Sequence, residues 1–315
     1  MDGIENKKLE LRSLRDGFGE AVFNLAKSNR NVFVLSADLS PSLRIESVRK
    51  ELPDQFVECG VAEQNIVGIA AGLAISGKIP FVASFAEFLT GRAWEQIRID
   101  VCYNNVNVKL IGSHAGLATG EDGATHQMLE DLALMRVLPN MTVVAPCDAN
   151  EAYQATIAAS KINGPVYIRL ARPETPIITD KNTPFEIGKI NIVKQGKDIV
   201  IFATGLSVYE ALLAAETLKE QGKSVAVLNV HTIKPLDKET IKKFVKDAKL
   251  VITVEDHQII GGLGSAISEV LTDNNINVPL KRLGVNNSFG ESGKYKELWE
   301  KYGIDKEGIL KAIGG

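Results

Sequence analysis

Short apolar runs of strand-forming residues alternate with longer helical stretches along most of this chain, and this alternation constrains its fold most strongly. The runs have the composition of strands that are buried on both faces, and they lie at 31–35, 79–83, 106–111, 141–145 and 166–170. Helical patterns separate them, at 14–28, at 63–76 and from Asp148 through Ser160, where Asp148 and Glu151 resemble a capping box. Alternation of this kind implies a mostly parallel, doubly wound α/β sheet.

A break in the pattern divides the chain. Residues 172–189 hold three of the 11 prolines and have no helical period, which indicates an inter-domain linker. Beyond it the alternation resumes, with strands expected at 199–203, 224–228 and 250–254 and helices at 206–221, 238–245 and 262–272. Since 315 residues exceed one ordinary core, we predict two doubly wound, mostly parallel-sheet domains at 11–175 and 190–315.

Composition excludes several classes of function. The formal net charge is −3 and Lys and Arg are not clustered, which argues against a nucleic-acid surface. No apolar run reaches the ~20 residues of a membrane span, and the polar residues 1–10 lack the apolar stretch of a signal peptide. Three cysteines without CxxC spacing indicate neither a disulfide framework nor a zinc site. We expect a cytoplasmic protein that binds no nucleic acid or membrane.

Two segments carry candidate binding groups beside strands or helices. Glu63 stands at the head of a very apolar helix, where it is either a solvated first-turn acid or an active-site acid that exchanges a proton. Phe85 and Phe88 follow a strand directly. They either pack in the core or line a slot for a ring, because ligands of α/β sheets bind at the carboxyl ends of strands.

The segment from Gly112 to Gln127 carries the strongest signal. It holds two of the four histidines, His114 and His126, among acidic and Thr residues and glycines at 112, 116, 120 and 123. A pair of histidines suits proton transfer near neutral pH, although two surface histidines remain the alternative. A metal site is disfavoured, because no cysteine or ordered carboxylate spacing accompanies them.

Taken together, these segments resemble the transketolase family over essentially the whole chain. The resemblance rests on GEDGATHQ (120–127), on 129–151 and on GVAEQN (60–65), with further matches at SADLSPS (36–42) and LRD (14–16). HTIKPLD (231–237) and EDHQIIGGLGSA (255–266) support the wider group of thiamine enzymes. The resemblance to the transketolase family implies a pyrimidine-binding domain followed by a C-terminal domain. It also implies an enzyme that uses thiamine diphosphate.

Half of the family pattern is missing. Family members bind the cofactor's diphosphate and Mg²⁺ through a GDG motif and a downstream Asn, whereas this chain has EDG at 121–123 without such a sequel. The resemblance therefore implies the smaller subunit of a split transketolase. It should pair with an N-terminal diphosphate-binding subunit that holds the metal, with two copies of each chain in the assembly.

Roles follow from the resemblance by position. Glu63 should activate the cofactor, Phe88 with Phe85 should stack on its aminopyrimidine, and Asp38 should lie beside the thiazolium. For phosphorylated sugars, the resemblance implies that His114 and His126 contact reacting oxygens, that Asp122 reads a hydroxyl and that the phosphate is held by Arg15, Ser42 and Arg172. From the residues alone, Arg172 could equally form a linker salt bridge and Arg15 could be a solvated helix-face residue.

Three readings of the function remain open at this point. The first is a two-carbon ketol transfer between sugar phosphates, as in the pentose phosphate pathway. The second is a subunit of a pyruvate-using relative, either a 2-oxo-acid dehydrogenase β subunit or a deoxyxylulose-phosphate synthase. His114-Ala115-Gly116 is closer to the latter than to the HDS triplet of longer transketolases, and Gly91 stands where a third aromatic is expected. The third is a catalytically silent regulatory partner.

Overall fold

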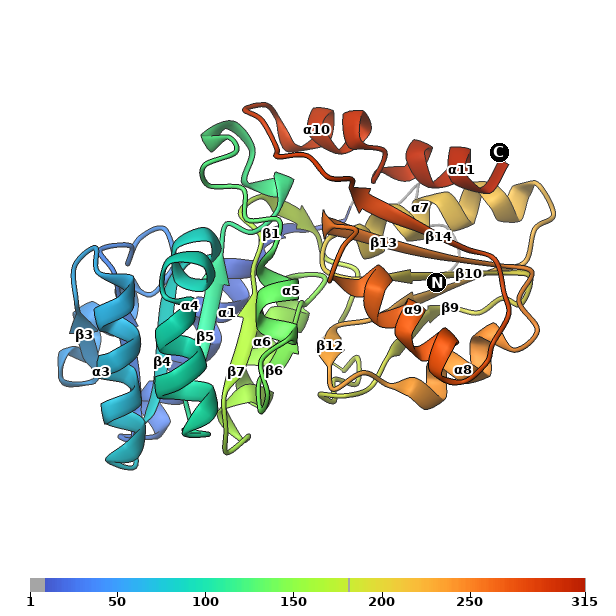
Figure 1. Cartoon of the computed structure of the whole chain (residues 1–315). Coiled ribbons are helices and arrows are strands. Elements are labelled where there is room, and N and C mark those ends of the chain that lie inside the picture. Colours follow the sequence, from blue (N-terminus) through green and yellow to red (C-terminus); the bar gives the residue numbers. More distant parts are fainter. Residues whose placement is uncertain (1–8, 181, 315) are drawn as a thin grey trace.

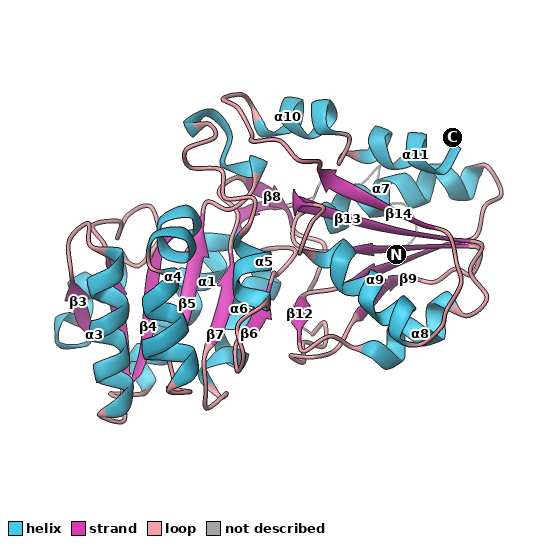
Figure 2. Cartoon of the chain, in the orientation of Figure 1, coloured by secondary structure: helices cyan, strands magenta, loops and turns pink. Residues whose placement is uncertain are grey.

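The computed structural model describes residues 9–180 and 182–314, and it contains two α/β units that lie side by side (Figure 1). Helices cover both units, and the two main sheets run through their interiors (Figure 2). The predicted fold class, two units with parallel-dominated sheets, is confirmed. The predicted end of the second domain, residue 315, lies outside the described residues.

The first sheet has seven strands in the order β12-β6-β7-β5-β4-β2-β3. All its pairs are parallel except β12 with β6. The strands are β2 (Val32–Ser36), β3 (Phe56–Glu58), β4 (Ile79–Phe85), β5 (Lys109–Ser113), β6 (Thr142–Val144), β7 (Val166–Arg169) and β12 (Thr232–Lys234). Because β12 comes from beyond the linker, this sheet is completed by the second half of the chain. The division at 11–175 and 190–315 therefore stays a prediction.

The second sheet has five strands in the order β14-β13-β10-β11-β9, with β9 antiparallel to β11. Its strands are β9 (Asn191–Lys194), β10 (Ile199–Ala203), β11 (Val225–Asn229), β13 (Leu250–Gln258) and β14 (Leu280–Val285). Its helices are α7 (Ser207–Glu220), α8 (Lys238–Val245), α9 (Leu263–Asp273), α10 (Tyr295–Tyr302) and α11 (Lys306–Gly314). The strands and helices expected from 199 to 272 are confirmed to within a few residues.

The expected linker is not wholly irregular. β8 (Glu174–Pro176) pairs antiparallel with β1 (Leu11–Ser13) and forms a small two-stranded sheet. The antiparallel register pairs Leu11 with Pro176, so the start of the linker is tied to the segment that leads into α1. A three-residue strand with a terminal proline carries no periodic signal, which is why the sequence did not reveal it.

Helices of the first unit follow the sequence closely in most places. They are α1 (Leu14–Ser28), α2 (Glu46–Glu51), α3 (Glu63–Ile75), α4 (Trp94–Gln96), α5 (Asp131–Arg136) and α6 (Ala149–Ser160), with short 3₁₀ segments η1 (Pro53–Gln55) and η4 (Leu117–Asp122). α1 begins where Ser13 accepts a hydrogen bond from the Arg15 N–H while Asp16 accepts one from the Ser13 N–H. This reciprocal capping box fixes the orientation of the first turn, which carries Arg15.

Two local predictions were incomplete. Asp148 caps α6 as expected, but the Glu151 carboxylate accepts the Cys147 N–H rather than the Asp148 N–H, so only half of a capping box forms. The crossover from β4 to β5 also contains two π-helical segments, η2 (Glu87–Arg92) and η3 (Ile97–Tyr103), that periodicity did not indicate. π-helical turns shift side chains around the helix axis and are frequent at functional sites.

Residues of the central strands alternate between two packed layers. Phe81 and Ala83 of β4 pack in the layer that contains Phe18 of α1, whereas Val82 packs with Ile66 of α3 on the other face. Both layers are fully buried at these positions. The helices on either face therefore hold the sheet in place, and its strand ends form a fixed edge.

The order of the strands creates a crevice at that edge. The chain passes from β2 outward to β3 and then returns across β2 to β4 and β5. At such a switch point the loops diverge, and ligands bind outside the carboxyl ends of the strands. Asp38 follows β2, Phe85 ends β4 and His114 follows β5. The topology thus brings three predicted site residues to one edge.

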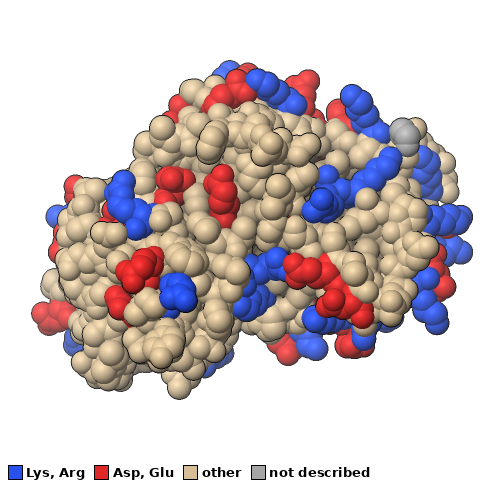
Figure 3. Space-filling view, viewed as in Figure 1, with Lys and Arg blue, Asp and Glu red and all other residues tan. Residues whose placement is uncertain are grey.

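The surface carries charges of both signs. Acidic and basic side chains are interspersed over the face shown in Figure 3. Among the described residues, no helix has the length and apolar character needed to cross a bilayer.

Candidate active site

Four aromatic rings form a continuous wall at the carboxyl edge of the first sheet. The ring centroids of Phe85 and Phe88 lie 6.2 Å apart with planes inclined by 25°. The imidazole of His114 stacks on Phe85 at 3.9 Å, and His126 meets Phe88 edge-on at 5.2 Å. The β4 terminus, η2 and the loop after β5 therefore bring together two predicted cofactor-binding residues and two predicted catalytic residues. The alternative of two surface histidines is wrong for His114, which is 4% exposed.

Glu63 lies at one end of this wall. Its side chain is 2% exposed, so the alternative of a solvated first-turn acid is wrong. One carboxylate oxygen, Oε2, accepts a hydrogen bond from Nη1 of Arg92 at 2.7 Å. The same guanidinium lies 4.7 Å from the centroid of the Phe88 ring. Arg92 thus links the buried acid to the aromatic wall and leaves Oε1 of Glu63 for another partner.

His114 is held in an electrostatic environment that opposes its charged form. Burial, followed by the charges of Arg15, Arg172 and His126, lowers the pKa of His114 to about 3. Its Nδ1 lies 3.0 Å from the hydroxyl of Ser113. The imidazole is therefore neutral at physiological pH, and it does not titrate there as the unperturbed value of a histidine had suggested. A neutral imidazole can accept a proton or a hydrogen bond.

Arg15 is half-buried and its guanidinium is fixed in three directions. It donates to the Ser13 hydroxyl from Nε at 3.0 Å, to the Ser42 carbonyl from Nη1 at 2.8 Å and to the Arg172 carbonyl from Nη2 at 2.6 Å. The alternative of a solvated helix-face residue is therefore wrong. Burial, with the positive charge of Arg44, lowers the pKa of Arg15. Two of the five N–H groups of the Arg15 guanidinium take no part in these three hydrogen bonds, one on each terminal nitrogen.

Arg172 approaches the loop that carries the two histidines. Its Nη1 donates to the Thr119 carbonyl at 2.7 Å and lies 3.3 Å from Oδ1 of Asp122 and 3.5 Å from Glu121. These ion pairs join Arg172, the first residue of the expected linker, to this loop. Arg172 therefore does form a salt bridge, and its role in binding a phosphate stays a prediction. Arg15 and Arg172 together form the cationic group of the site. Because the charges of both arginines lower the pKa of His114, this cationic group lies within electrostatic reach of the ring wall.

Two further predicted residues occupy the same edge in different settings. Ser42 contributes its backbone carbonyl to Arg15. Asp38 is exposed and adopts a left-handed backbone conformation, with φ of 60°, and its N–H donates to the Glu58 carboxylate at 2.8 Å. A non-glycine residue in this region is uncommon and indicates a backbone held by its surroundings. Asp38 therefore has a defined position after β2.

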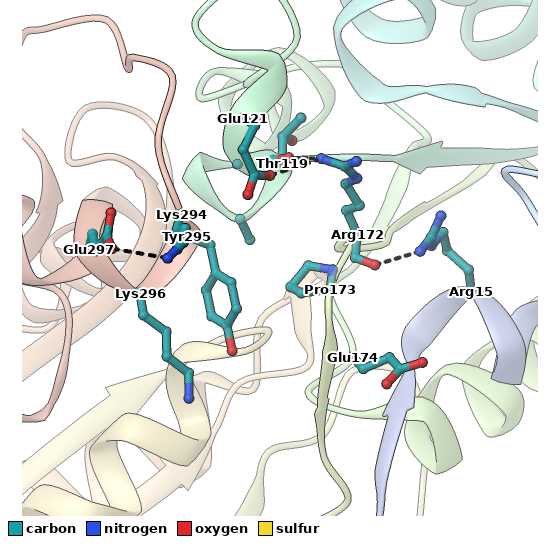
Figure 4. Close-up of a pocket in the computed structure, with 12 residues that line it drawn as sticks. Arg15, Thr119, Glu121, Arg172, Pro173, Glu174, Lys294, Tyr295, Lys296 and Glu297 are labelled. Carbon is teal, nitrogen blue, oxygen red and sulfur yellow. Dashed lines mark hydrogen bonds and ion pairs between the residues drawn. The ribbon is translucent and has the colours of Figure 1, made fainter.

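A groove of about 610 Å³ adjoins the cationic group and lies between the two α/β units. One side is formed by Arg15, Arg172 and their neighbours, and the other by residues Lys294 to Glu297 at the start of α10 (Figure 4). Nζ of Lys294 lies 3.8 Å from a carboxylate oxygen of Glu297, and this ion pair spans the first turn of α10. The second α/β unit thus contributes to the surroundings of the predicted substrate-binding arginines, which the sequence did not indicate.

The donor groups of this site suit an aromatic ring and anions better than a metal. Within residues 9–180 and 182–314, no group of three or more His, Cys, Asp or Glu side chains is placed to hold a metal ion. Sequence reasoning missed Arg92, although it follows Phe88 by four residues, the spacing of neighbours on one helix face. It also missed Asp256, which contacts the histidine-bearing loop through its carboxylate.

Two family models match this chain. Residues 11–177 match the transketolase pyrimidine-binding domain, and residues 188–309 match the transketolase C-terminal domain. The chain belongs to the transketolase family. The family resemblance stated from the sequence is thereby confirmed, and the ring wall and the acid at its end lie in the pyrimidine-binding domain.

Relatives of similar length are known from several organisms. A protein of Methanocaldococcus jannaschii named as a transketolase C-terminal section is 49% identical, covering 96% of this chain and 95% of its own. The 6-deoxy-6-sulfo-D-fructose transketolase subunit of Clostridium sp. is 41% identical, and the alignment covers 97% of this chain and 94% of that subunit. A solved structure described as a split-gene transketolase, an inactive β4 tetramer, has a TM-score of 0.89 and 42% identity and covers 96% and 97%. The chain therefore corresponds to one subunit of the split form of transketolase.

Proposed function

We propose that this chain is the subunit of a thiamine-diphosphate-dependent transketolase that receives the aminopyrimidine end of the cofactor and the sugar. It would transfer a two-carbon ketol unit from a ketose phosphate to an aldose phosphate. The observation that carries the proposal is the wall of Phe85, Phe88, His114 and His126, with the Glu63 carboxylate buried at one end and two arginines within electrostatic reach at the other.

The residues at the first end suit an aminopyrimidine. Phe85 and Phe88 offer ring faces for stacking, and Oε1 of Glu63 stays available because Arg92 occupies Oε2. Glu63 would share a proton with a ring nitrogen of the aminopyrimidine, a role that a carboxylate can fill and an amide cannot. Asp38, fixed after β2, would face the thiazolium. The cofactor, when bound, supplies the carbon centre that accepts the two-carbon fragment.

The two histidines would contact different reacting oxygens of the sugar. His114 is neutral, so it is suited to accept a proton from a hydroxyl of the substrate. The His126 ring, whose centroid lies 6.3 Å from that of Phe85 and 5.2 Å from that of Phe88, would contact the second reacting oxygen. Asp122 would read a hydroxyl next to the acceptor carbonyl, which requires it to leave or share its ion pair with Arg172.

An anionic tail on the sugar would bind at Arg15, Ser42 and Arg172. A guanidinium fork matches the oxygens of a phosphate, and Arg15 is already oriented by three hydrogen bonds. Related subunits are named for sugars with such tails, a sulfo-sugar in Clostridium sp. and apulose 4-phosphate in Phocaeicola vulgatus. These names support a phosphorylated or similarly charged substrate, either in pentose interconversion or in a more specialised route.

The remaining half of the site would come from a second subunit. The chain covers 48% of the length of human transketolase at 38% identity. We infer that an N-terminal subunit binds the diphosphate and Mg²⁺, and that two copies of each chain form the active complex.

The test is reconstitution. This chain is mixed with a candidate subunit that carries a GDG motif and a downstream Asn, together with thiamine diphosphate and Mg²⁺. Exchange between a ketose phosphate and an aldose phosphate is followed, with pyruvate offered in a parallel reaction. Sugar exchange that requires both chains supports the proposal. Release of CO₂ from pyruvate without sugar exchange, or full activity of this chain alone, contradicts it.

A further inference from the structure

The loop that carries the proposed catalytic groups, residues 114–127, has four residues with positive φ. His114 has a positive φ of 55°, and Gly116, Gly120 and Gly123 have φ values of 78°, 78° and 76°. A non-glycine residue in the left-handed region is uncommon and persists only when its surroundings impose it. The conformation of His114 is therefore held by its surroundings. One contact is local, since the Thr119 hydroxyl donates to the His114 carbonyl at 2.7 Å, and others hold the rest of the loop in place.

Asp256, in the second α/β unit, makes two of the contacts that hold this loop. Its Oδ1 accepts the Leu117 N–H at 2.8 Å and its Oδ2 accepts the Ala118 N–H at 3.0 Å. These are the first N–H groups of η4, so the carboxylate acts as a cap supplied from 138 residues away in sequence. A Cβ on Gly116 would lie 2.2 Å from Oδ2 of Asp256, so the approach requires glycine at that position.

Asp256 is itself fixed against the first unit. Its carbonyl accepts a hydrogen bond at 2.7 Å from Nη2 of Arg169, which lies on β7. The Nε of Arg169 is bound to the fully buried Asp131 at 2.8 Å, and Tyr167 donates to the same carboxylate at 2.7 Å. The cap is therefore anchored through the sheet on which the site is built.

A second set of contacts holds the other end of the loop. The Gln127 amide donates to the Gly120 carbonyl at 2.9 Å and to the Glu291 carbonyl at 2.8 Å. The Ser292 hydroxyl donates to the Glu121 carbonyl at 2.7 Å. Residues before α10 thus bracket the stretch between Asp122 and His126, and Figure 1 shows α10 beside this green loop.

From these contacts we infer that the second α/β unit takes part in the reaction by setting the geometry of the histidine-bearing loop, with Asp256 as its positioning residue. Among the described residues, no hydrogen bond or ion pair joins Asp256 to the four rings of the wall, so it acts through Leu117 and Ala118 on the placement of His114 and Asp122. The inference rests on the proposed function for its kinetic readout but not for its structural readout. It gives the second unit a role that the transketolase match does not assign to it.

The experiment uses a matched pair of neighbouring carboxylates. Glu255 is fully buried and accepts two backbone N–H groups, those of Leu263 and Gly264, each at 2.7 Å. Its partners lie within its own unit, at the start of α9. D256N and E255Q therefore each replace a buried carboxylate that caps a helical turn by an amide, and of the two only D256N acts on residues of the loop.

In the reconstituted complex, D256N should lower kcat by roughly 10²-fold, the typical effect of a displaced catalytic group, while the Kd for thiamine diphosphate changes by less than about twofold. E255Q should keep kcat within about threefold of wild type. Hydrogen exchange on the chain alone should show faster exchange of the Leu117 and Ala118 amides in D256N and wild-type exchange in E255Q. Circular dichroism and thermal unfolding establish that both variants fold.

A wild-type kcat in D256N, or an equal loss in both variants, overturns the inference. If the wild-type complex exchanges no sugars, the proposed function fails, and the exchange measurement decides the inference by itself. Unchanged protection of Leu117 and Ala118 in a folded D256N chain would then overturn it. Should D256N fail to fold, Asp256→Glu keeps the charge and displaces the carboxylate from the Leu117 and Ala118 N–H groups. It should show the same loss of kcat and of amide protection, and wild-type values of both would overturn the inference.

Discussion

The guanidinium of Arg92 lies 2.7 Å from the carboxylate of Glu63 and 4.7 Å from the ring of Phe88. One residue therefore contacts both the buried acid and the aromatic wall. The pair is asymmetric, because Glu63 is 2% exposed whereas the Arg92 side chain is half-exposed. Arg92 extends inward from η2. The buried Glu63 carboxylate needs this charged partner, whereas the guanidinium of Arg92 is also partly hydrated by solvent.

Replacement of Arg92 by Met should destabilise the chain by about 1–2 kcal/mol, since a buried carboxylate loses a charged hydrogen-bond donor that is itself partly solvated. Urea unfolding of the isolated chain measures this free energy. The matched control is Arg98→Met, because Arg98 is exposed on the following segment, η3. Equal stability of R92M and R98M would show that the ion pair contributes little.

Glu63→Gln should abolish most activity while the complex still assembles. Loss of acid–base assistance by a carboxylate typically lowers a rate by ~10²- to 10⁴-fold. The measurement is sugar exchange by the reconstituted complex, with Glu95→Gln, an exposed acid on α4, as the control. An E63Q complex that exchanges sugars at the wild-type rate would remove Glu63 from the proposed mechanism.

Arg172→Met should act on the charged tail of the substrate. Charged hydrogen bonds contribute about 1.5–3 kcal/mol, so KM for phosphorylated sugars should rise roughly 10- to 100-fold. KM for the same sugars without phosphate should change little. Arg12→Met is the control, because Arg12 forms its ion pair with Glu20 at 3.2 Å on the outer face of α1. A similar rise for charged and uncharged sugars would mean that Arg172 acts by supporting Asp122 and the loop.

His114 should make folding sensitive to mild acid. Its pKa is lowered to about 3, whereas in the unfolded chain it is about 6.5, so between these values the unfolded chain binds one more proton. The free energy of unfolding therefore falls as pH falls from 6.5 toward 3. Relative to His114→Asn, wild type should lose roughly 2 kcal/mol more between pH 7 and pH 5. Parallel losses in urea unfolding at the two pH values would contradict the low pKa.

Regular elements with strong periodicity could be predicted from the sequence. α1 begins and ends at Leu14 and Ser28 as expected, because its apolar stripe is regular and Ser13 caps it. The edge that collects Phe85 and His114 also follows from strand order, since parallel strands place their carboxyl ends together. These features depend on local pattern and on topology, both of which the sequence encodes directly.

Contacts between distant segments could not be predicted in this way. The approach of Arg92 to Glu63 depends on η2, whose π-helical turn leaves no periodic signal. The caps on Leu117 and Ala118 depend on how β13, which carries Asp256, is oriented toward the first unit. The low pKa of His114 arises from burial and from two arginines, one before and one after it in the chain, that only the folded structure brings near.

The edge strand β12 has a consequence for how this polypeptide can be divided. It covers β6 with antiparallel pairing although it belongs to the far side of the linker. A fragment that stopped near residue 189 would expose the backbone donors and acceptors of β6 as a template for self-association. Proteolytic or engineered cuts between the two units should therefore yield a fragment that is prone to aggregate.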